Sequence, residues 1–501
     1  MIQGCEEKMA DPYKIVIGLE VHVQLLTKTK LFCGCSTQFG LPPNTATCPV
    51  CLGMPGVLPV MNRRAFELSL KAAVALNCEI NRYTKWDRKN YYYPDLPKNF
   101  QTSQFDLPFC WEGHLQIPTS SGPKRIRIDH IHLEEDAGKM LHDEKGTGRN
   151  SLVDLNRTGT PLLEIVSKPD LNAPEEARAY LEEIRLLMRE LEVSDCEMQE
   201  GSLRCDANIN LHIPTGDGKF VATPIVEVKN LNSIRSVERA MKYEAERQFK
   251  EFQKTKVTIE SGDKATAAWD ENRGITFIMR RKELASDYRY FPEPDLMPVV
   301  VDDVWLGRIR AEMGELPSAA RARLHTEHQL SEYDADVIVR QGKAFLSYFE
   351  EVAAACGDAK DASNWMTNQV LAYLNDEKID IHEFEITAPN LADLARRVRE
   401  DGIPKSQAKK VFAQMVKTGE DAGKSMDAMG LRPITDEADV LAYVQKAIEA
   451  NPKAVADYRK GKKKAAEAIK GAVMRETNGM AKVEVVSQLL VKALQSMSEA
   501  E

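Results

Sequence analysis

The stretch "KIVIGLEVHVQL", residues 14–25, decides the fold of the N-terminal part of the chain. Its odd-numbered positions are all apolar, whereas the even-numbered ones include Glu20, His22 and Gln24. A period of two predicts a β-strand with one buried face. Glu20 and His22 leave the other face about 7 Å apart along the strand. They are therefore either solvated side chains or half of a metal site.

The length and composition of the chain describe an ordinary globular protein with several domains. Its 501 residues are too many for one core, so two to four domains are expected. Hydrophobic residues make up 43% and charged residues 29%, and no apolar run approaches the roughly 20 residues of a membrane span. The N-terminus has no apolar core typical of a secretory signal, which favours the cytoplasm. A net charge of −9 means that any nucleic-acid contact must be local.

The two parts of the chain differ in pattern, which predicts an α+β fold. Residues 1–298 contain short strand-like runs such as "RIRIDHIHL" and "PIVEVKNL", with helices expected over 174–192 and 237–252. The proline-rich "YFPEPDLMPVV" is interpreted as a linker. Beyond it the pattern is almost entirely helical. We predict a first domain over 1–298 with a mixed or antiparallel sheet, a helical connector over 299–425 and a small helical tail over 426–501.

Four of the ten cysteines lie close together, in a loop at about residues 30–55 with the sequence "FCGCSTQFGLPPNTATCPVCLG". They are Cys33, Cys35, Cys48 and Cys51. Two closely spaced pairs joined by a loop rich in proline and glycine suit a tetrahedral zinc site with four thiolate ligands. Such a zinc ion would be structural and would hold together a loop with few apolar residues. The alternative is four unconnected thiols.

Oxygen and imidazole donors gather in three further segments of the N-terminal half. "RIDHIHLEEDAGKM" contains His130, His132, Glu134, Glu135 and Asp136; "SLVDLNRTGTPLLEIV" contains Asp154, Asn156, Arg157 and Glu164; "MQEGSLRCDANINL" contains Glu200, Arg204, Asp206, Asn208 and Asn210. This mixture suits Mg²⁺ bound with a phosphorylated substrate, and arginines suit phosphate oxygens. The pattern indicates phosphoryl transfer without a P-loop, because no such motif occurs. The alternative is the solvated face of an antiparallel sheet.

Several long blocks, read in order, carry a resemblance to one family. They are "VIGLEVHVQL", "PNTATCPVCLGMPGVLPVMN", "DRKNYYYPDLPKNFQTSQFD", "HLEEDAGK", "LVDLNRTGTPLLEIV", "EGSLRCDANI", "VEVKNLNS" and "DYRYFPEPDL". In these blocks the chain resembles the B subunits of the aspartyl/glutamyl-tRNA(Asn/Gln) amidotransferases. The resemblance runs from about residue 13 to the C-terminus, where "YRKGKKKAAEAIKGAVMRETNGMAKVEVVSQLL" is similar to the tRNA-binding tail of that family.

The resemblance implies a ligase that forms a carbon–nitrogen bond on tRNA. In that family, ATP and Mg²⁺ are used to phosphorylate the side-chain carboxylate of misacylated Glu-tRNA(Gln) or Asp-tRNA(Asn). Ammonia from a glutamine-hydrolysing amidase, the A subunit, then displaces phosphate, giving Gln-tRNA(Gln) or Asn-tRNA(Asn). The small C subunit joins the other two into a heterotrimer. The sequence leaves open whether the glutamine route, the asparagine route or both operate.

The family motifs also imply residue roles. Glu20 and His22, with Glu134 or Glu135, become the expected Mg²⁺ ligands, and Glu164 is a further candidate. Among these, Glu20, His22, Glu135 and Glu164 are the residues we expect to be catalytic. The candidates for ATP, phosphate and acceptor-end contacts are Lys89, Asn90, Tyr91, Arg204 and Lys229. For these five, a purely structural role is the alternative.

Two further features concern partners. The amidase reaction needs a Ser-Ser-Lys arrangement in a Gly/Ser-rich segment, and "TSSGPKR", residues 119–125, lacks glycine-rich flanks. We therefore expect a partner to supply the ammonia. In the tail, residues 459–470 carry six basic residues against one acidic. Lys462, Lys463 and Lys464 are predicted to contact tRNA phosphates; a solvated helix start is the alternative.

Two other functional classes compete with the enzyme. One is a non-catalytic tRNA-binding scaffold, which would have no need for Glu20, His22 and Glu135 together. The other is a free zinc-ribbon module, which fits poorly because the cysteine cluster is a small fraction of the chain.

Overall fold

The opening stretch forms strand β1 (Lys14–Gln24), which lies in the middle of a large sheet. Its odd-numbered side chains are fully buried from Ile17 to Val23, whereas Glu20, His22 and Gln24 on the other face are partly exposed. The predicted strand and its buried face are confirmed.

The computed structural model describes residues 12–141, 150–216, 218–282, 287–400, 403–431, 434, 436–459, 462, 464–477 and 479–499. The chain divides into two compact units, Met1–Ser318 and Ala319–Glu501. Within the described part, no helix is both long enough and apolar enough to cross a membrane.

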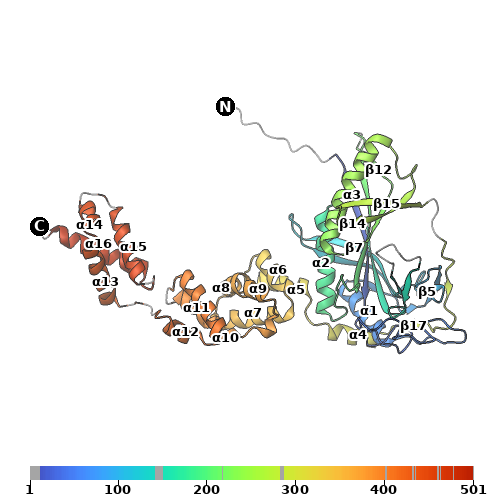
Figure 1. The fold of residues 1–501 in the computed structure, drawn as a ribbon, viewed down its shortest axis with the longest axis horizontal. Coiled ribbons are helices and arrows are strands. Elements are labelled where there is room, and N and C mark those ends of the chain that lie inside the picture. Colours follow the sequence, from blue (N-terminus) through green and yellow to red (C-terminus); the bar gives the residue numbers. More distant parts are fainter. Residues whose placement is uncertain are drawn as a thin grey trace. The chain divides into compact units, whose positions relative to one another are not determined.

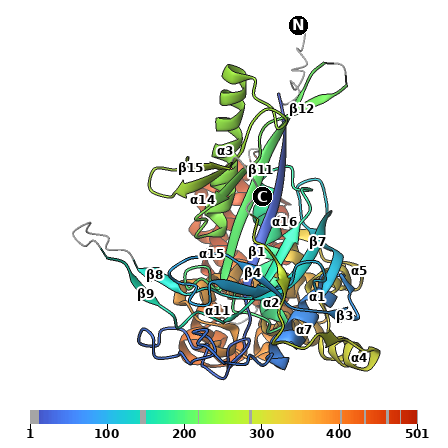
Figure 2. The same ribbon diagram turned by 90° about the vertical axis from the view of Figure 1, so that its right-hand side faces the viewer.

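Ten strands of the described part of the first unit form the main sheet (Figures 1 and 2). Its order is β15 (Ile275–Lys282), β14 (Lys264–Asp270), β13 (Val226–Lys229), β11 (Leu203–Pro214), β1, β10 (Pro161–Ser167), β7 (Lys124–Glu135), β6 (Cys110–Ile117) and β2 (Glu79–Ile80), with β12 (Phe220–Ala222) paired to β11. Neighbours are antiparallel except β13 and β14, which are parallel. The sheet is therefore mixed, as predicted.

Three helices, α1 (Arg63–Ala75), α2 (Pro174–Glu190) and α3 (Ile234–Thr255), pack on the apolar face of this sheet. Helix α2 begins with a proline and two glutamates, which suit the free N–H groups and positive dipole of a helix start. Helix α3 begins three residues before the predicted position, because the Ser233 side chain accepts a hydrogen bond from the Ser236 N–H and caps the helix. Both helices expected from the sequence are confirmed.

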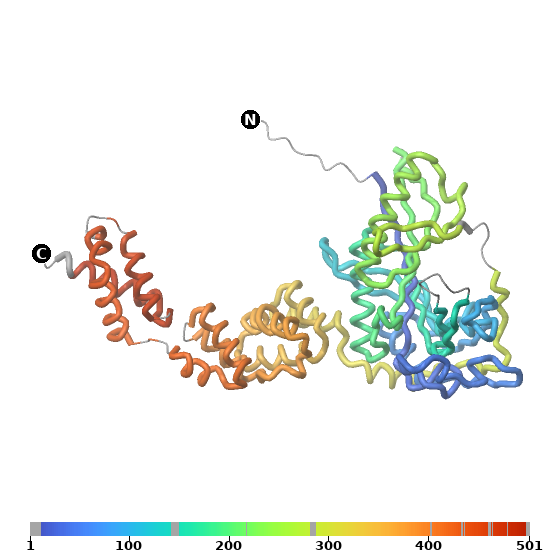
Figure 3. The backbone as a smooth tube through the Cα atoms, viewed as in Figure 1, coloured from blue at the N-terminus to red at the C-terminus, as the bar shows by residue number. Residues whose placement is uncertain are grey.

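Short strands form three smaller sheets in the first unit. They are β16 (Phe291–Pro292), β4 (Asp87–Asn90) and β5 (Phe100–Ser103); β17 (Val299–Val300) and β3 (Tyr83–Thr84); and β8 (Lys139–Leu141) and β9 (Leu152–Asp154). The proline-rich stretch interpreted as a linker thus pairs twice with the first unit. Figure 3 shows this yellow-green segment returning to the blue strands.

The first unit also extends past the expected boundary at residue 298. Helix α4 (Asp303–Glu312) buries Leu306 and Ile309 in the main core of that unit. The unit ends at Ser318. Helix α4 belongs to this unit, and not to the domain that follows in the sequence, because the core of the first unit covers its apolar side chains.

The second unit is helical in its described residues. Its elements are α5 (Pro317–Thr326, which crosses the boundary), α6 (Glu332–Arg340), α7 (Lys343–Cys356), α8 (Ala359–Trp365), η1 (Met366–Val370), α9 (Leu371–Glu377), η2 (Ile381–Glu383), α10 (Ala388–Glu400), α11 (Lys405–Thr418), α12 (Ala422–Ala428), α13 (Glu437–Ala450), α14 (Pro452–Arg459), α15 (Ala465–Glu476) and α16 (Val483–Glu499). One hydrophobic cluster, which includes Val440, Val444, Ile469 and Leu490, lies wholly within the segment expected to form the tail.

Candidate active site and metal centres

The polar face of the sheet carries a row of functional side chains on four adjacent strands. In the register of the sheet, His22 on β1 lies opposite Arg204 on β11 and Glu164 on β10. Glu164 in turn lies opposite His132 on β7. Because residues opposite each other in antiparallel strands are about 5 Å apart, the strand pairing alone brings these four together.

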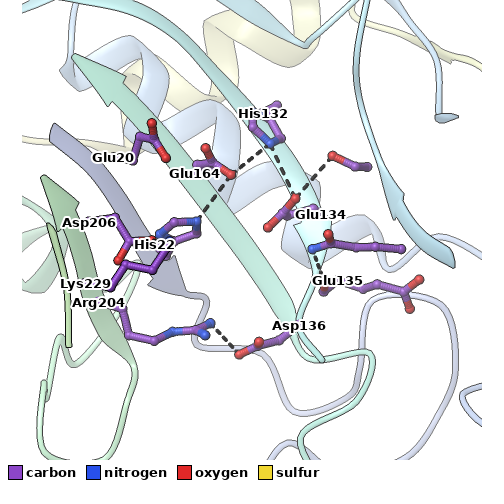
Figure 4. Close-up of polar contacts among 12 residues, drawn as sticks. Glu20, His22, His132, Glu134, Glu135, Asp136, Glu164, Arg204, Asp206 and Lys229 are labelled. Atoms are coloured by element: carbon purple, nitrogen blue, oxygen red, sulfur yellow. Dashed lines mark hydrogen bonds and ion pairs between the residues drawn. The ribbon is translucent and has the colours of Figure 1, made fainter. Parts of the chain in front are cut away.

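Side-chain contacts join this row into a cluster with Glu134 (Figure 4). The Oε2 atom of Glu164 lies 3.3 Å from Nε2 of His22 and 3.2 Å from Nε2 of His132. Nε2 of His132 also lies 3.5 Å from Oε2 of Glu134, which accepts a hydrogen bond of 3.2 Å from the Ser103 hydroxyl. His22, Glu134 and Glu164 each offer a donor atom within 4.8 Å of the others, so together they could hold a metal ion.

A second group of possible metal ligands lies beside the first on strands β1, β11 and β13. Glu20, Asp206 and Glu227 also offer donor atoms within 4.8 Å of one another. Lys229 forms ion pairs with Asp206 and, at 2.8 Å, with Glu227. Asn208 donates a 2.9 Å hydrogen bond to Glu20, and its own buried Oδ1 accepts none from any described residue. A free oxygen beside three carboxylates suits a hard cation.

The charged groups of the cluster lie close together and shift one another's pKa values. Burial lowers the pKa of His22 and His132 and raises that of Glu164, but their mutual contacts outweigh burial. As a result the pKa of each histidine is raised and that of Glu164 is held well below its usual range. Burial and then the neighbouring carboxylates raise the pKa of Glu20. The carboxylates thus favour the protonated form of both histidines, and a bound cation would replace that positive charge.

Glu135 lies away from the cluster, although the sequence places it next to Glu134. Successive residues of a strand point to opposite faces. Glu135 forms an ion pair with Lys98 and accepts a 2.9 Å hydrogen bond from the Thr102 N–H. Of the two glutamates that the sequence left open, the structure brings Glu134 to His22, and it directs Glu135 towards Lys98.

Arg204 lies at the edge of the site, held by a buried carboxylate. Its Nη2 donates to Oδ2 of Asp136 at 2.7 Å, and Gln24 donates to the same oxygen at 2.7 Å. Burial opposes the ionisation of Asp136, but Arg204 and Arg157 hold its pKa below the usual value. Asp136 therefore stays charged and fixes the direction of the Arg204 guanidinium, with part of that group exposed.

Three consecutive candidates, Lys89, Asn90 and Tyr91, occupy different surroundings. The ammonium of Lys89 lies over the ring of Tyr288 at 5.1 Å. Burial by itself would lower the pKa of Lys89, but nearby groups, Glu134 foremost among them, raise the pKa by more than burial lowers it. Lys89 therefore faces the cluster as a cation. Asn90 instead donates to the backbone carbonyls of Tyr288 and Arg289, which is a structural role. The hydroxyl of Tyr91 donates to Gln101 at 3.1 Å.

The four predicted cysteines meet in the loop after β1. The sulfur atoms of Cys33, Cys35, Cys48 and Cys51 all lie within 4.8 Å of one another. Zinc with Zn–S bonds of about 2.3 Å needs sulfurs roughly 3.8 Å apart, and those of Cys48 and Cys51 are 3.9 Å apart. A hydrogen bond from the Cys33 thiol lowers the pKa of Cys51, which suits its role as a thiolate. The donor set therefore fits a tetrahedral zinc ion.

A buried lysine supports the cysteine loop. Lys30 is fully buried, and its ammonium donates to the carbonyls of Ala46 at 2.8 Å and Leu155 at 3.4 Å. The same ammonium lies 3.6 Å from the Cys51 sulfur. It therefore joins the loop to the strand region around residue 155 and places positive charge beside the thiolates.

We expect Lys30→Met to lower the free energy of unfolding by about 2–3 kcal/mol, because it leaves buried carbonyls without their charged donor. Urea unfolding followed by circular dichroism would measure the change. The exposed Lys28 provides the control, since Lys28→Met should change stability by less than about 0.5 kcal/mol. A Lys30→Met chain as stable as the control would contradict this role.

The remaining predicted segments lie outside this site. Residues 119–125 cover the turn that joins β6 to β7 and the start of β7; in the turn, the backbones of Thr119 and Gly122 hydrogen-bond to each other. In the tail, Lys462 and Lys464 are exposed, and Lys462 forms an ion pair of 3.2 Å with Asp457. Lys463 lies outside the described residues.

Sequence reasoning missed two residues of the two ligand groups, Asp206 and Glu227, and one residue that contacts the first group, His132. His132 and Asp206 were noted as donors but not chosen, and Glu227 was not singled out. The alternating "VEVK" of β13 contains Glu227, so its period of two was a usable signal. The pairing of β13 with β11, which places Glu227 opposite Asn208, could not be read from that pattern.

Comparison with known proteins agrees with the two-part organisation. Residues 15–307 match the family model described as GatB/GatE catalytic domain, and residues 347–494 match the one described as GatB domain. The chain is 49% identical over 488 residues to the B subunit of the aspartyl/glutamyl-tRNA(Asn/Gln) amidotransferase of Rhodopirellula baltica, covering 97% of this chain and 98% of the relative. Proteins of the same name from Caldicellulosiruptor bescii and Thermotoga maritima are 47% and 46% identical, covering 97% and 96% of this chain and 100% and 99% of the relatives.

Proposed function

Because the chain belongs to the family of B subunits of the aspartyl/glutamyl-tRNA(Asn/Gln) amidotransferases, we propose that it activates the side-chain carboxylate of a misacylated tRNA. The substrate would be Glu-tRNA(Gln), Asp-tRNA(Asn) or both. ATP would phosphorylate that carboxylate, and ammonia would then displace phosphate to form the amide.

One observation carries the proposal: the convergence of His22, Glu134 and Glu164 beside a second carboxylate group on the same sheet face. A carboxylate is a poor acyl donor, because its leaving group would be oxide, whereas an acyl phosphate can lose phosphate. The γ-phosphate of ATP and the substrate carboxylate are both anions, so they approach each other only where positive charge lies between them. A group of hard donors suits this reaction, because it can bind a cation and so place positive charge between the two anions.

The residues of the site would divide the work as follows. His22, Glu134 and Glu164 would hold Mg²⁺, which when bound supplies positive charge between the two anions. Glu20, Asp206 and Glu227 could hold a second cation beside Lys229, which forms ion pairs with Asp206 and Glu227. Lys89 faces the cluster as a half-buried cation, and Arg204 is held in place by Asp136. Both would bind phosphate oxygens and orient them.

The ammonia would come from another polypeptide. The relatives are named as one lettered subunit of an amidotransferase, and residues 119–125 offer no amidase motif. We propose that an amidase, the A subunit, hydrolyses glutamine and that it forms a heterotrimer in the cytoplasm with this chain and the small C subunit. The structural role proposed for zinc is to hold the cysteine loop.

The complex purified with the amidase and the small C subunit should convert Glu-tRNA(Gln) to Gln-tRNA(Gln) in the presence of ATP, Mg²⁺ and glutamine. Without this chain, those two partners should hydrolyse glutamine poorly. Any hydrolysis that remains should not produce Gln-tRNA(Gln). If the two partners alone form Gln-tRNA(Gln), the chain is only a tRNA-binding scaffold. The two ligand groups argue against a scaffold, which has no need for them.

The tail is proposed to bind tRNA through its basic segment. Charge reversal at Lys462, Lys463 and Lys464 should weaken tRNA binding and flatten its salt dependence, because fewer counterions are released when fewer phosphates are neutralised. If each lysine meets one phosphate, the slope of log affinity against log salt should fall by about 3. Deleting residues from about 426 should also weaken binding while the complex still hydrolyses glutamine.

Titration of labelled tRNA at several salt concentrations measures this slope. Lys446 and Lys492, which lie in the same tail outside the basic segment, provide a charge-reversed control. An unchanged slope in the triple variant would show that the three lysines do not meet phosphate.

A further inference from the structure

A cavity of about 440 Å³ lies among helices α8, α10 and α11 of the second unit and the π-helical turn η1. None of the roles proposed above uses it. Its size falls within the range of pockets that bind small molecules or single groups of a larger ligand. Figure 1 shows these helices together in the yellow-to-orange part of the chain. Trp365 lies at the end of α8 and lines the cavity.

The π-helical turn shapes one wall of this cavity. In η1 the Leu371 N–H donates to the carbonyl of Met366, five residues earlier, so the turn contains one residue more than an α-helical turn. The extra residue changes the direction of the side chains around it, and Asn364, Trp365, Asn368 and Gln369 all line the cavity. Turns of this kind are rare and occur frequently at functional sites.

The amides on this wall are available to a ligand. No described residue hydrogen-bonds to the side-chain amide of Asn364 or Gln369. Asn368 differs, because it donates to the Asn364 carbonyl at 3.0 Å. An amide offers a donor and an acceptor side by side, which matches the edge of a nucleobase. The half-buried indole of Trp365 beside them offers a flat apolar face on which a base can stack.

Another part of the cavity lining carries positive charge from α11. Lys405 and Lys409 are one turn apart, exposed, and without a carboxylate partner among the described residues. Lys405 stands in the first turn of α11, which has no side-chain cap and no acidic residue, so positive charge accumulates there against the helix dipole. Arg399 is different, because it is paired with Asp361 at 3.6 Å and donates to the Cys356 carbonyl at 2.8 Å. The two lysines are therefore the groups left for an anion.

We propose that this cavity is a nucleotide subsite for tRNA: an unstacked base packs on Trp365 and is read by Asn364 and Gln369, while Lys405 and Lys409 bind its phosphates. Single-stranded loops and ends of RNA present bases in this way. The proposal rests on the proposed function, which makes tRNA the substrate. It assigns to the helical unit a contact distinct from the basic segment of the tail.

The first test measures affinity for tRNA with the full chain. Lys405→Glu with Lys409→Glu should weaken binding about tenfold or more and lower the salt slope by about 2. The matched control is Lys410→Glu with Lys417→Glu, two exposed lysines of the same helix that do not line the cavity. The control should change affinity by less than about twofold. Equal losses in both double variants would overturn the subsite, because they would show only general attraction of charge.

The second test probes the base. Trp365 is the only tryptophan of the second unit, so the tRNA-induced fluorescence change that is lost in Trp365→Phe reports on this cavity. Gln369→Glu, which keeps the shape but adds negative charge, should weaken tRNA binding about tenfold without lowering the rate of phosphoryl transfer at saturating tRNA. A fluorescence change in Trp365→Phe as large as that of the unmodified chain, or unchanged affinity of Gln369→Glu, would overturn the proposal.

Two further outcomes separate the possible sources of failure. If AMP alone changes Trp365 fluorescence as strongly as tRNA and displaces it, the occupant is a free nucleotide and the tRNA subsite is overturned. If the unmodified chain does not bind charged tRNA, the proposed function fails and the subsite fails with it. Normal binding by the unmodified chain with no effect of any cavity variant overturns the subsite alone.

Discussion

We expect His22→Ala to slow phosphoryl transfer to Glu-tRNA(Gln) about a hundredfold or more. His22 lies with Glu134 and Glu164 in the first ligand group, so its loss removes one ligand from the cation that neutralises the transferring phosphate. Losing such a ligand should cost roughly 3 kcal/mol or more of transition-state stabilisation. The fold should survive, because the buried odd-numbered face of β1 is unchanged.

The adjacent glutamates provide a matched pair for the same assay. Glu134→Gln should slow phosphoryl transfer as much as His22→Ala, because Glu134 belongs to the ligand group. Glu135→Gln makes the same chemical change one residue along, on the side that faces Lys98. Its phosphoryl-transfer rate should stay within about tenfold of the unmodified chain, a loss of no more than roughly 1.4 kcal/mol.

The measurement follows labelled phosphate from ATP to Glu-tRNA(Gln) in the assembled complex without an ammonia donor. Glutamine hydrolysis, which we assign to the amidase partner, should continue in all three variants and serves as the control for assembly. If His22→Ala forms the phosphorylated intermediate at the normal rate, His22 is not a ligand. The polar face of β1 would then be an ordinary solvated face.

Cys48→Ser is expected to have the second large effect, on structure rather than on rate. We predict about one zinc ion per chain, held by the four cysteines. Binding of structural zinc is worth roughly 10–16 kcal/mol in small zinc domains, more than the few contacts of this loop can replace. Loss of one thiolate should therefore release most of the metal and unfold residues 30–60.

Metal analysis of protein purified without chelator and limited proteolysis of the loop would check this prediction. Cys78→Ser is the control, since Cys78 is half-buried and lies outside the cluster. It should retain the metal and resist cleavage in the loop. Protein that contains no zinc before any substitution would show that the four sulfurs meet without a metal.

Much of the local structure could be predicted because its cause is local. The period of two in residues 14–25 depends only on which side chains alternate, and it identified both β1 and its buried face. Pro174 and the glutamates after it identified the start of α2 in the same way. The spacing of the cysteine pairs predicted a cluster whose sulfurs do lie together, because short spacing limits how far each pair can separate.

The sequence by itself therefore determined the period of each element, the chemical types in the site and the family resemblance. Only the tertiary structure decided which donors meet. The distance between His22 and Glu164 depends on how β1 pairs with β10, and a shift of one residue would turn every side chain of a strand to the other face. Strand pairing likewise decided which of Glu134 and Glu135 meets His22, and it joined Glu227 to Glu20. Such pairing is set by contacts between residues far apart in the chain, which a pattern of neighbours does not contain.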